Sequence, residues 1–470
     1  MDGNPDLSGT WTLTGDRSRS RFLLLALACA ILFLGAIRSG DLAGYDDALY
    51  ATEAKNVLRS GDWLNPSIRG EAALEHPPLF VWTQALCMSV FGISDIAAKA
   101  PSALSAIGTV LLVYWLARRL LRDQLAALVA MFVMLATPYF IKYASHAMTD
   151  VPTTLLFVCA MCAWSLVDRD PRWCLAAGAF TAMALMTRGL IGFALPAIFA
   201  IDLMVTRSFP PKRYLMAALL IAILPLTSWY AYAWLHHSEF TADHSGWLER
   251  EVYGPFTPSW RRYTGPIETA FMLGKSYWPW LPAMVAGLVL VIRRHRRELY
   301  SLLSWAAVVF LLCSIARSRV LRYLLPAYPA FAILSASAIA KLTPRRFLER
   351  AMSWIPPASV LAAVGLVVLL RPIWHASEIL PIARAASHPP GQTVGFYDAS
   401  PPRWDEANQL EWYGDCVPRM IRTPGDLDRA LRTLPVHTFV VDKPTYENVL
   451  RQLPHDVVAE SGHLVCVRLR

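Results

Sequence analysis

Residues 22–37 read FLLLALACAILFLGAI, and residues 46–78 read DDALYATEAKNVLRSGDWLNPSIRGEAALEHPP. The first stretch is an uninterrupted apolar run, whereas the second is polar and acidic. A helix needs about 20 mostly apolar residues to cross roughly 30 Å of hydrocarbon, so the first stretch predicts a membrane span. No small-residue cleavage site follows it, which favours a retained anchor over a removed signal peptide. The acidic stretch then begins where the chain first leaves the bilayer.

The rest of the chain repeats this alternation. Of its 470 residues, 55% are hydrophobic and only 17% are charged, whereas soluble domains carry about 25% charged residues. We therefore expect an all-α polytopic membrane protein, because helices satisfy their own backbone polar groups in lipid. The apolar runs predict about eleven transmembrane helices, near residues 22–38, 96–117, 124–141, 151–167, 173–187, 189–206, 214–235, 270–292, 299–316, 323–340 and 352–370. The short apolar segment 79–92 suggests an interfacial or re-entrant helix.

The basic residues explain the net charge of +9 without a nucleic-acid partner. They gather in short clusters at every second loop, which is the pattern of cytoplasmic loops in membrane proteins. The clusters are Arg17, Arg19 and Arg21; Arg118, Arg119 and Arg122; Arg169 and Arg172; Arg207, Lys212 and Arg213; Arg293, Arg294, Arg296 and Arg297; and Lys341, Arg345, Arg346 and Arg350. We expect a multi-pass plasma (inner) membrane protein with a cytoplasmic N-terminus.

This topology divides the chain into three parts. Residues 1–20 form a cytoplasmic tail, residues 21–370 form the transmembrane domain, and residues 371–470 form a small α/β domain on the outer side. The transmembrane domain has outer loops at 39–95 and 236–269. The tail domain is predicted from β-like runs at 393–397 and 438–441 and a helix-like stretch at 424–434. If it is exported, Cys416 and Cys466 can form a disulfide.

Carboxylates at two places on the outer side are candidates for acid–base chemistry. Asp46 and Asp47 are adjacent, so on a helix they point about 100° apart and only one faces a given pocket. Either is a candidate general base; the alternative is that the pair stabilises a helix N-terminus. Asp150 opens a span two residues before Pro152, which suits a helix cap formed by Thr149 or Asp150. Ionisable groups at membrane depth are also functional candidates.

Some arginines lie on the predicted outer side, although basic residues of membrane proteins are normally enriched in cytoplasmic loops. Arg188 interrupts two apolar runs, and Arg319 and Arg322 precede another. Arginine forks pair with phosphate oxygens, so these residues suit a phosphate at headgroup level. The alternative is snorkelling to lipid phosphates without specificity.

Metal and nucleotide signatures are weak. His236, His237 and His244 share a loop, but their spacing matches no zinc pattern. The sequence also has no Gly-rich phosphate loop, so an outer-face reaction is expected to draw on a preactivated donor.

Several of these segments together resemble membrane glycosyltransferases of the GT-C type, in the branch of protein O-mannosyltransferases and lipid A aminoarabinose transferases. The resemblance covers roughly residues 20–345 and rests on the order and spacing of its motifs. They are Asp46-Asp47-Ala48-Leu49-Tyr50-Ala51, Ser60-Gly61-Asp62-Trp63, Glu75-His76-Pro77-Pro78-Leu79, Pro101-Ser102-Ala103-Leu104, Thr149-Asp150-Val151-Pro152, Thr187-Arg188-Gly189, Ser318-Arg319 and Arg322-Tyr323-Leu324-Leu325-Pro326.

The resemblance implies a reaction and a set of residues. Asp46 is implied as the base that accepts a proton while the acceptor attacks and inverts the anomeric carbon, and Asp150 as its catalytic companion. A polyprenyl-phosphate-linked sugar is implied as donor. The residues implied to bind substrate are Asp47, Tyr50, Glu75, His76, Arg188, Arg319, Arg322 and Tyr323.

Two departures from the family pattern concern the donor phosphate. The family usually has lysine where this chain has His76, and commonly lysine where it has Arg188. His76 carries charge less reliably at neutral pH, so Arg188 is expected to take over part of the phosphate contact.

A polytopic lipid or sugar-lipid flippase is the main alternative. A flippase or transporter predicts inverted repeats and ionisable groups near span centres, whereas here the carboxylates gather on one side. A scaffold whose tail binds a partner is a third hypothesis, and it leaves the acidic loop unexplained. The sugar, the acceptor (lipid, glycan or protein) and any use of a divalent metal stay open at this point.

Overall fold

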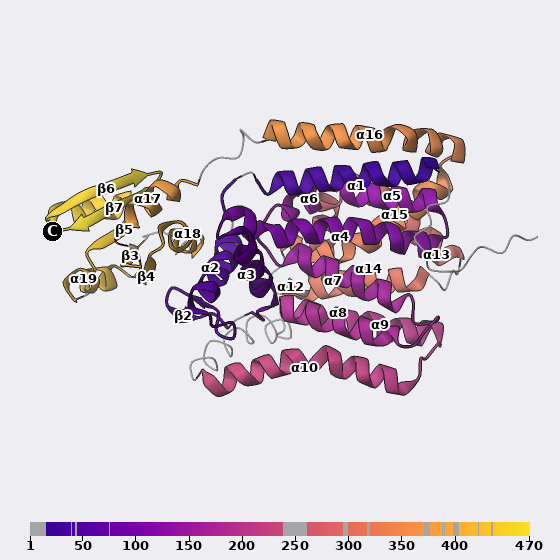
Figure 1. Cartoon of the computed structure of the whole chain (residues 1–470), viewed down its shortest axis with the longest axis horizontal. Helices are drawn as coiled ribbons and strands as arrows, with labels where there is room; N and C mark the ends of the chain where they lie inside the picture. Colours follow the sequence, from indigo (N-terminus) through magenta and orange to yellow (C-terminus); the bar gives the residue numbers. More distant parts are fainter. Residues whose placement is uncertain are drawn as a thin grey trace, which may run out of the picture.

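The computed structural model describes residues 16–470 except 39, 43–44, 75, 238–260, 295–298, 317–319, 371–376, 388, 390, 398–403, 422 and 434–435. A bundle of roughly parallel helices forms one end of the molecule and a small sheet domain forms the other (Figure 1). The predicted all-α polytopic architecture with a C-terminal α/β domain is confirmed.

The first half of the bundle carries the acidic stretch on helices of its own. Its helices are α1 (Asp16–Ala36), α2 (Tyr45–Ser60), α3 (Leu79–Phe91), α4 (Asp95–Leu121), α5 (Gln124–Leu135), α6 (Pro138–Ala144) and α7 (Asp150–Trp164). Side-chain caps set two of the starts: Ser94 accepts from the amide of Ala97, and Asp123 from those of Leu125 and Ala126. The helix expected after Asp46 is α2, and the short apolar segment is α3. Both lie between the bundle and the sheet domain (Figure 1).

The second half completes the bundle. Its elements are α8 (Trp173–Arg188), the 3₁₀ turn η1 (Gly189–Phe193), α9 (Ala194–Thr206), α10 (Lys212–His236), α12 (Arg261–Ser276), α13 (Leu281–Arg294), α14 (Tyr300–Ile315), η5 (Leu321–Ala327), α15 (Tyr328–Leu342) and α16 (Arg345–Leu370). The single span expected over 270–292 is wrong, because the chain breaks between α12 and α13. Much of the predicted outer loop 236–269 lies outside the described residues.

The run from α8 to α9 reverses direction at η1. Cys174 at the start of α8 and Leu203 near the end of α9 pack in one cluster, so the two helices are antiparallel. The turn is tight: a Cβ on Gly192 would lie 2.8 Å from the amide nitrogen of Leu185. This geometry supports two passes meeting near Arg188, as the sequence predicted.

Length and hydropathy limit how many helices can cross a membrane. Within the described ranges six apolar segments are long enough to cross a membrane, when 173–206 is counted as one segment. The number is seven if α5 and α6, which meet at 62°, together form one broken span. Four shorter apolar helices accompany them: α3, α7, α13 and α14. The predicted number of eleven spans stays a prediction.

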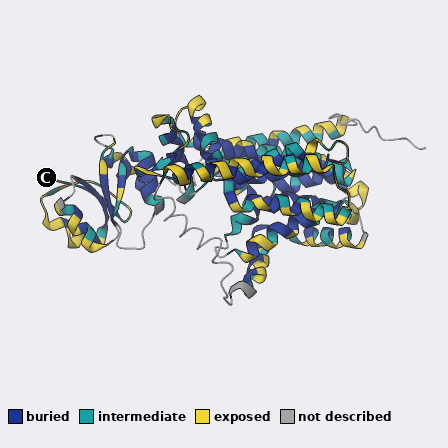
Figure 2. Cartoon of the chain, turned by 90° about the horizontal axis from the view of Figure 1, so that it is seen from below, coloured by how far each residue is buried: buried dark blue, intermediate teal, exposed yellow. Residues whose placement is uncertain are grey.

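The bundle surface is itself apolar. Exposed residues run along the outer helices (Figure 2), and many are large hydrophobics, such as Leu220 and Leu224 on α10 and Leu361 and Leu369 on α16. A soluble protein rarely leaves so much apolar area in water. Apolar side chains thus fill the bundle interior and also cover its outer surface, as expected of helices in lipid.

The C-terminal domain is a five-stranded sheet with helices against it. The strand order is β4-β3-β5-β7-β6, in which β3 pairs in parallel with β4 and β5, and β7 runs antiparallel to β5 and β6. Its elements are α17 (Ile379–Ala386), β3 (Thr393–Tyr397), α18 (Trp404–Gly414), β4 (Val417–Ile421), α19 (Pro424–Thr433), β5 (Thr438–Asp442), α20 (Lys443–Asn448), η6 (Leu450–Gln452), β6 (His455–Ser461) and β7 (Leu464–Leu469). A two-stranded ribbon, β1 (Ser67–Ile68) with β2 (Glu71–Ala72), lies in the outer loop.

The possible disulfide in this domain does not form. Cys416 and Cys466 are both free and buried in the same hydrophobic cluster. Burial raises the pKa of each thiol to about 12, so both behave as small apolar core residues.

Close helix packing at Gly287 gives a first prediction. A Cβ there would lie 2.6 Å from the carbonyl carbon of Leu334 on α15, and backbone cannot move aside cheaply. Gly287→Ala is therefore expected to lower the melting temperature of the detergent-solubilised protein. Gly365→Ala on α16 is the matched control, because nothing lies within 4 Å of its Cβ and alanine favours a helix by about 1 kcal/mol over glycine. Equal melting temperatures for the two variants would contradict the predicted packing.

Candidate active site

Helix α2 brings the acidic pair to the end of the bundle that faces the C-terminal domain (Figure 1). Asp46 and Asp47 occupy its first turn, so their carboxylates also favour the helix dipole. The two side chains point to different neighbours, as their 100° separation predicts. Asp46 forms an ion pair with Arg322, and the Oδ2 of Asp47 lies 2.6 Å from Nδ1 of His146.

A second aspartate joins the first through the same arginine. Nε of Arg322 lies 3.7 Å from Oδ2 of Asp150, and Arg188 forms an ion pair with Oδ1 of Asp150. Asp46, Arg322, Asp150 and Arg188 thus form a chain of alternating charge, named here the charge chain. It connects α2, η5, α7 and α8. Asp150 is only 2% exposed, and a buried charge at such a position must be paired.

The helix-cap hypothesis for 149–150 is only half right. Helix α7 does begin at Asp150, but the Thr149 side chain makes no capping hydrogen bond. The Asp150 carboxylate faces the two arginines instead of its own helix. Threonine 153 and Thr154 donate to the carbonyls of residues 149 and 150, so they stabilise the first turn.

Aromatic rings line the charge chain. The Arg188 guanidinium lies 4.6 Å from the centre of the Tyr323 ring, and that of Arg322 lies 5.9 Å from it, which are cation–π distances. On the other side Tyr50 is buried, and its ring centre is 5.9 Å from that of His76. Positive charge on His76 acts to lower the pKa of Asp46, which places this histidine next to the chain.

Burial is the largest influence on the pKa of Asp46. Desolvation raises the pKa of its carboxyl, and the negative charge of Asp150 raises it further. Arg322, Arg188 and His76 act in the opposite direction without cancelling the rise. A carboxylate with a raised pKa is a better proton acceptor than one free in water.

The structure brings most of the predicted site together. Asp46, Asp150, Arg188, Arg322, Tyr323, Tyr50 and His76 converge, while Asp47 faces His146 beside them. Glu75 and Arg319 lie outside the described residues, so their predicted roles stay predictions. None of the roles assigned to these residues is tested by their placement alone.

Two groups near the site escaped sequence reasoning. His146 stands four residues before Asp150, yet only the fold places it against Asp47. Lys55 is buried at the far end of α2 against the C-terminal domain. A lysine inside an amphipathic helix suggests an exposed position, so no sequence signal identifies its partner.

Metal ligation finds no support in the part of the chain described here. No group of three or more His, Cys, Asp or Glu residues in it is arranged to hold a metal ion. His237 Nε2 donates to the Asn65 amide oxygen at 2.7 Å, while His244 lies in the undescribed segment.

Comparison with known proteins gives this geometry a context. The family model of dolichyl-phosphate-mannose-protein mannosyltransferases matches residues 75–232. The solved structure of ArnT from Cupriavidus metallidurans bound to undecaprenyl phosphate has a TM-score of 0.75 and 18% identity, covering 95% of this chain and 97% of that one. The fold defines the class of structure: the chain has the GT-C fold of membrane glycosyltransferases.

Within that class, curated relatives have a common name. Undecaprenyl phosphate-alpha-4-amino-4-deoxy-L-arabinose arabinosyl transferases of Edwardsiella ictaluri and Pectobacterium carotovorum are 29% and 27% identical, over 63% and 75% of this chain. An uncharacterized protein of Aquifex aeolicus is 26% identical over 75% of the chain. The chain spans 55%, 66% and 70% of the lengths of these three proteins, respectively.

The buried pairing of Asp150 generates a second prediction. Asp150→Asn leaves Arg188 and Arg322 without the carboxylate between them, and breaking a buried pair costs about 3 kcal/mol. A lower melting temperature in detergent is expected. Asp62→Asn serves as control, because Asp62 is exposed and accepts hydrogen bonds from Leu64 and Asn65 of its own loop. If both variants melt like the parent, the charge chain does not hold the helices together.

Proposed function

We propose that this protein transfers a sugar from a polyprenyl phosphate, with undecaprenyl phosphate as the carrier, to an acceptor on the outer face of the membrane. The observation that carries the proposal is the charge chain, which places one carboxylate with a raised pKa beside two arginines at the edge of the bundle. The names of the curated relatives support 4-amino-4-deoxy-L-arabinose as the first sugar to test.

The orientation follows from charge. Basic residues gather at the opposite end of the bundle, where Arg345 pairs with Asp123 at 3.4 Å and Arg119 donates to the carbonyl of Ser165. Cytoplasmic ends of membrane helices are enriched in such residues. We therefore place that end and the N-terminus inside, in the plasma (inner) membrane, and the charge chain and C-terminal domain outside.

In the proposed reaction the Asp46 carboxylate accepts the proton and the two arginines stabilise the leaving phosphate. The acceptor O–H or N–H gives its proton to Asp46 while its lone pair attacks the anomeric carbon. The bond from that carbon to the phosphate oxygen breaks, the configuration inverts, and polyprenyl phosphate leaves with one additional negative charge. Arg188 and Arg322 stabilise that charge, because guanidinium forks match phosphate oxygens. The donor is the only cosubstrate this reaction requires.

Arg322 couples the two halves of this mechanism. It pairs with Asp46 and also faces Asp150. A phosphate held against it shares the guanidinium, which weakens its hold on the Asp46 carboxylate and raises the basicity of that group. Donor binding would thus activate the base.

The arrangement does not favour a flippase. A flippase predicts ionisable groups near span centres, whereas Asp46, Asp150, Arg188 and Arg322 lie at helix ends on one side. A direct assay separates the two functions: the purified protein in nanodiscs is given a radiolabelled undecaprenyl-phosphate sugar and an extract of outer-membrane glycolipids. Label transfer supports the proposal, and lipid movement without transfer contradicts it.

The base role of Asp46 is tested by Asp46→Asn. Loss of general base catalysis is expected to lower kcat by at least about 100-fold. Undecaprenyl phosphate should bind as well or better, because a negative charge beside Arg322 is removed. Asp47→Asn, one residue along, is the control and should lose far less, since Asp47 faces His146. Full activity of Asp46→Asn would remove this residue from the base role.

The pH profile offers an independent test. Because the pKa of Asp46 is raised, its carboxyl protonates at a higher pH than a free aspartate. The acid limb of kcat/KM, which reports the free enzyme, should therefore lie above the usual aspartate range. Removing the Asp150 charge in Asp150→Asn should move that limb to lower pH. A limb at the ordinary aspartate position, or one that Asp150→Asn leaves in place, would contradict this assignment.

A further inference from the structure

Helix α18 of the C-terminal domain bonds to the chain segment that leads into Asp46. Leu42 is fully buried four residues before Asp46. Its N–H donates to the hydroxyl of Tyr413 at 2.7 Å, and its carbonyl accepts from the Gln409 amide at 2.7 Å. Both backbone polar groups of Leu42 are thus satisfied by side chains more than 360 residues away along the chain.

A second contact lies at the other end of α2. Lys55 is 3% exposed, and its Nζ donates to the carbonyls of Glu411 at 2.8 Å and Trp412 at 3.1 Å. These carbonyls belong to the last turn of α18, where helix carbonyls lack partners and a cation is favourable. Arg59 adds an ion pair with Asp415 just beyond that turn.

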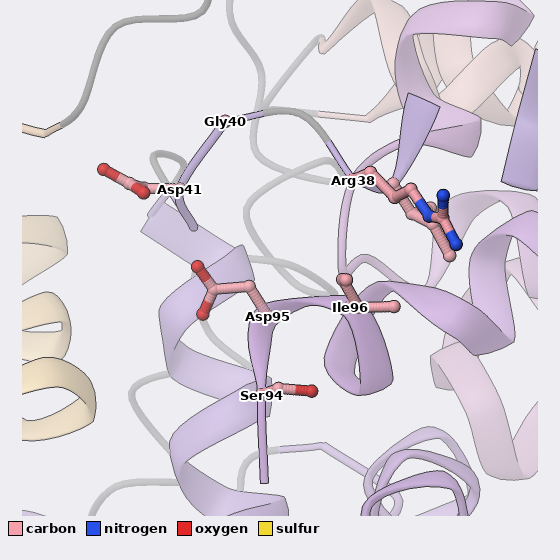
Figure 3. A pocket seen from close by; sticks show the side chains of 7 residues that line it. Arg38, Gly40, Asp41, Ser94, Asp95 and Ile96 are labelled. Carbon is pink, nitrogen blue, oxygen red and sulfur yellow. The ribbon is translucent and has the colours of Figure 1, made fainter. Parts of the chain in front are cut away.

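A third contact ties this junction to the bundle. Asp95 in the first turn of α4 accepts from the Trp412 indole at 2.8 Å and from the Tyr413 hydroxyl at 2.9 Å. Tyr413 therefore bridges Leu42 and α4. Asp41 and Asp95 also line an open pocket between α1 and α4, in which Arg38 extends away from the two carboxylates (Figure 3).

The contacts that α18 makes with Leu42, α2 and α4 are more extensive than those needed to attach the C-terminal domain to the bundle. Domains joined by a linker usually meet through modest, exposed polar contacts. Here the bonds of Lys55 and Gln409 are buried and those of Tyr413 are partly buried, and they converge on the entry and the body of one helix. Leaving either Leu42 group unpaired would cost about 1–3 kcal/mol, so these bonds restrict where α2 can begin and how it can turn about its axis.

We propose that Gln409, Tyr413 and Lys55 are positioning residues, through which the C-terminal domain holds α2 so that Asp46 faces Arg322. The catalytic part of this inference rests on the proposed function. A base displaced by about 1 Å can lose about 100-fold in rate, so loosening this junction should act on kcat rather than on donor binding.

Two substitutions remove bonds of this junction while nearly keeping side-chain shape. Tyr413→Phe deletes the hydroxyl that bridges Leu42 and Asp95. Gln409→Glu replaces the amide donor by an acceptor opposite the Leu42 carbonyl, and keeps the oxygen that accepts from Ser377. Matched controls lie elsewhere in the same domain: Tyr446→Phe removes a hydroxyl bonded to His455, and Gln452→Glu changes an amide that donates to the Asn448 carbonyl.

The full-length protein in nanodiscs is assayed for sugar transfer, undecaprenyl phosphate binding and hydrogen–deuterium exchange. For Tyr413→Phe and Gln409→Glu we expect a fall in kcat of about tenfold or more, with donor KM and undecaprenyl phosphate binding within about twofold of the parent. Exchange should accelerate in a peptide covering 41–50. Both controls should match the parent in every readout.

Three results would overturn the inference. One is a kcat within about twofold of the parent in both variants. Another is a fall in kcat that comes with an equal loss of undecaprenyl phosphate binding, which marks a general structural defect. The third is unchanged exchange at 41–50. If the parent protein transfers no sugar at all, the proposed function fails, and the exchange data still decide whether α18 positions α2.

Discussion

The pairing of Asp150 with two arginines is the interaction on which the rest of the structure depends. A carboxylate that is 2% exposed at the edge of a membrane bundle is tolerated only when opposite charges surround it. Arg188 provides one charge from the last residue of α8, and Arg322 provides the other from the start of η5. The reversal of the chain at η1 and the short 3₁₀ segment before α15 both keep a guanidinium within reach of α7.

The same constraint makes the site chemically competent. An ion-pair chain with one additional cation would hold Asp46 firmly ionised and weakly basic. Here two aspartates lie beside two arginines. The effect of burial on Asp46 outweighs the attraction of the arginines, so the pKa of Asp46 rises. Arg322 divides its charge between Asp46 and Asp150. In the proposed mechanism this one network both keeps the helices together and supplies the base and the phosphate site.

Sequence reasoning recovered the parts of this arrangement that hydropathy exposes. Asp46, Asp150, Arg188 and Arg322 stand out because each is a charge beside an apolar run. His146, Lys55 and Gln409 did not, because their partners are 99, 356 and 367 residues distant and no local pattern encodes such contacts. The break between α12 and α13 was missed for a similar reason: a short interruption hardly changes a window average. Whether Cys416 and Cys466 pair was left open by the sequence, because residue type does not show that both are free core residues.

The rotational setting of α2 links these observations. Consecutive helix residues differ by about 100°, so a turn of that size would present Asp47 to Arg322 and move Asp46 away from both Arg322 and His146. His146 selects one setting near the start of the helix by holding Asp47. Lys55 and Leu42, bound to α18, select the same setting from the far end and from the entry. Since these anchors come from the bundle and from the C-terminal domain, the choice of Asp46 over Asp47 is a property of the assembled chain rather than of the acidic pair itself.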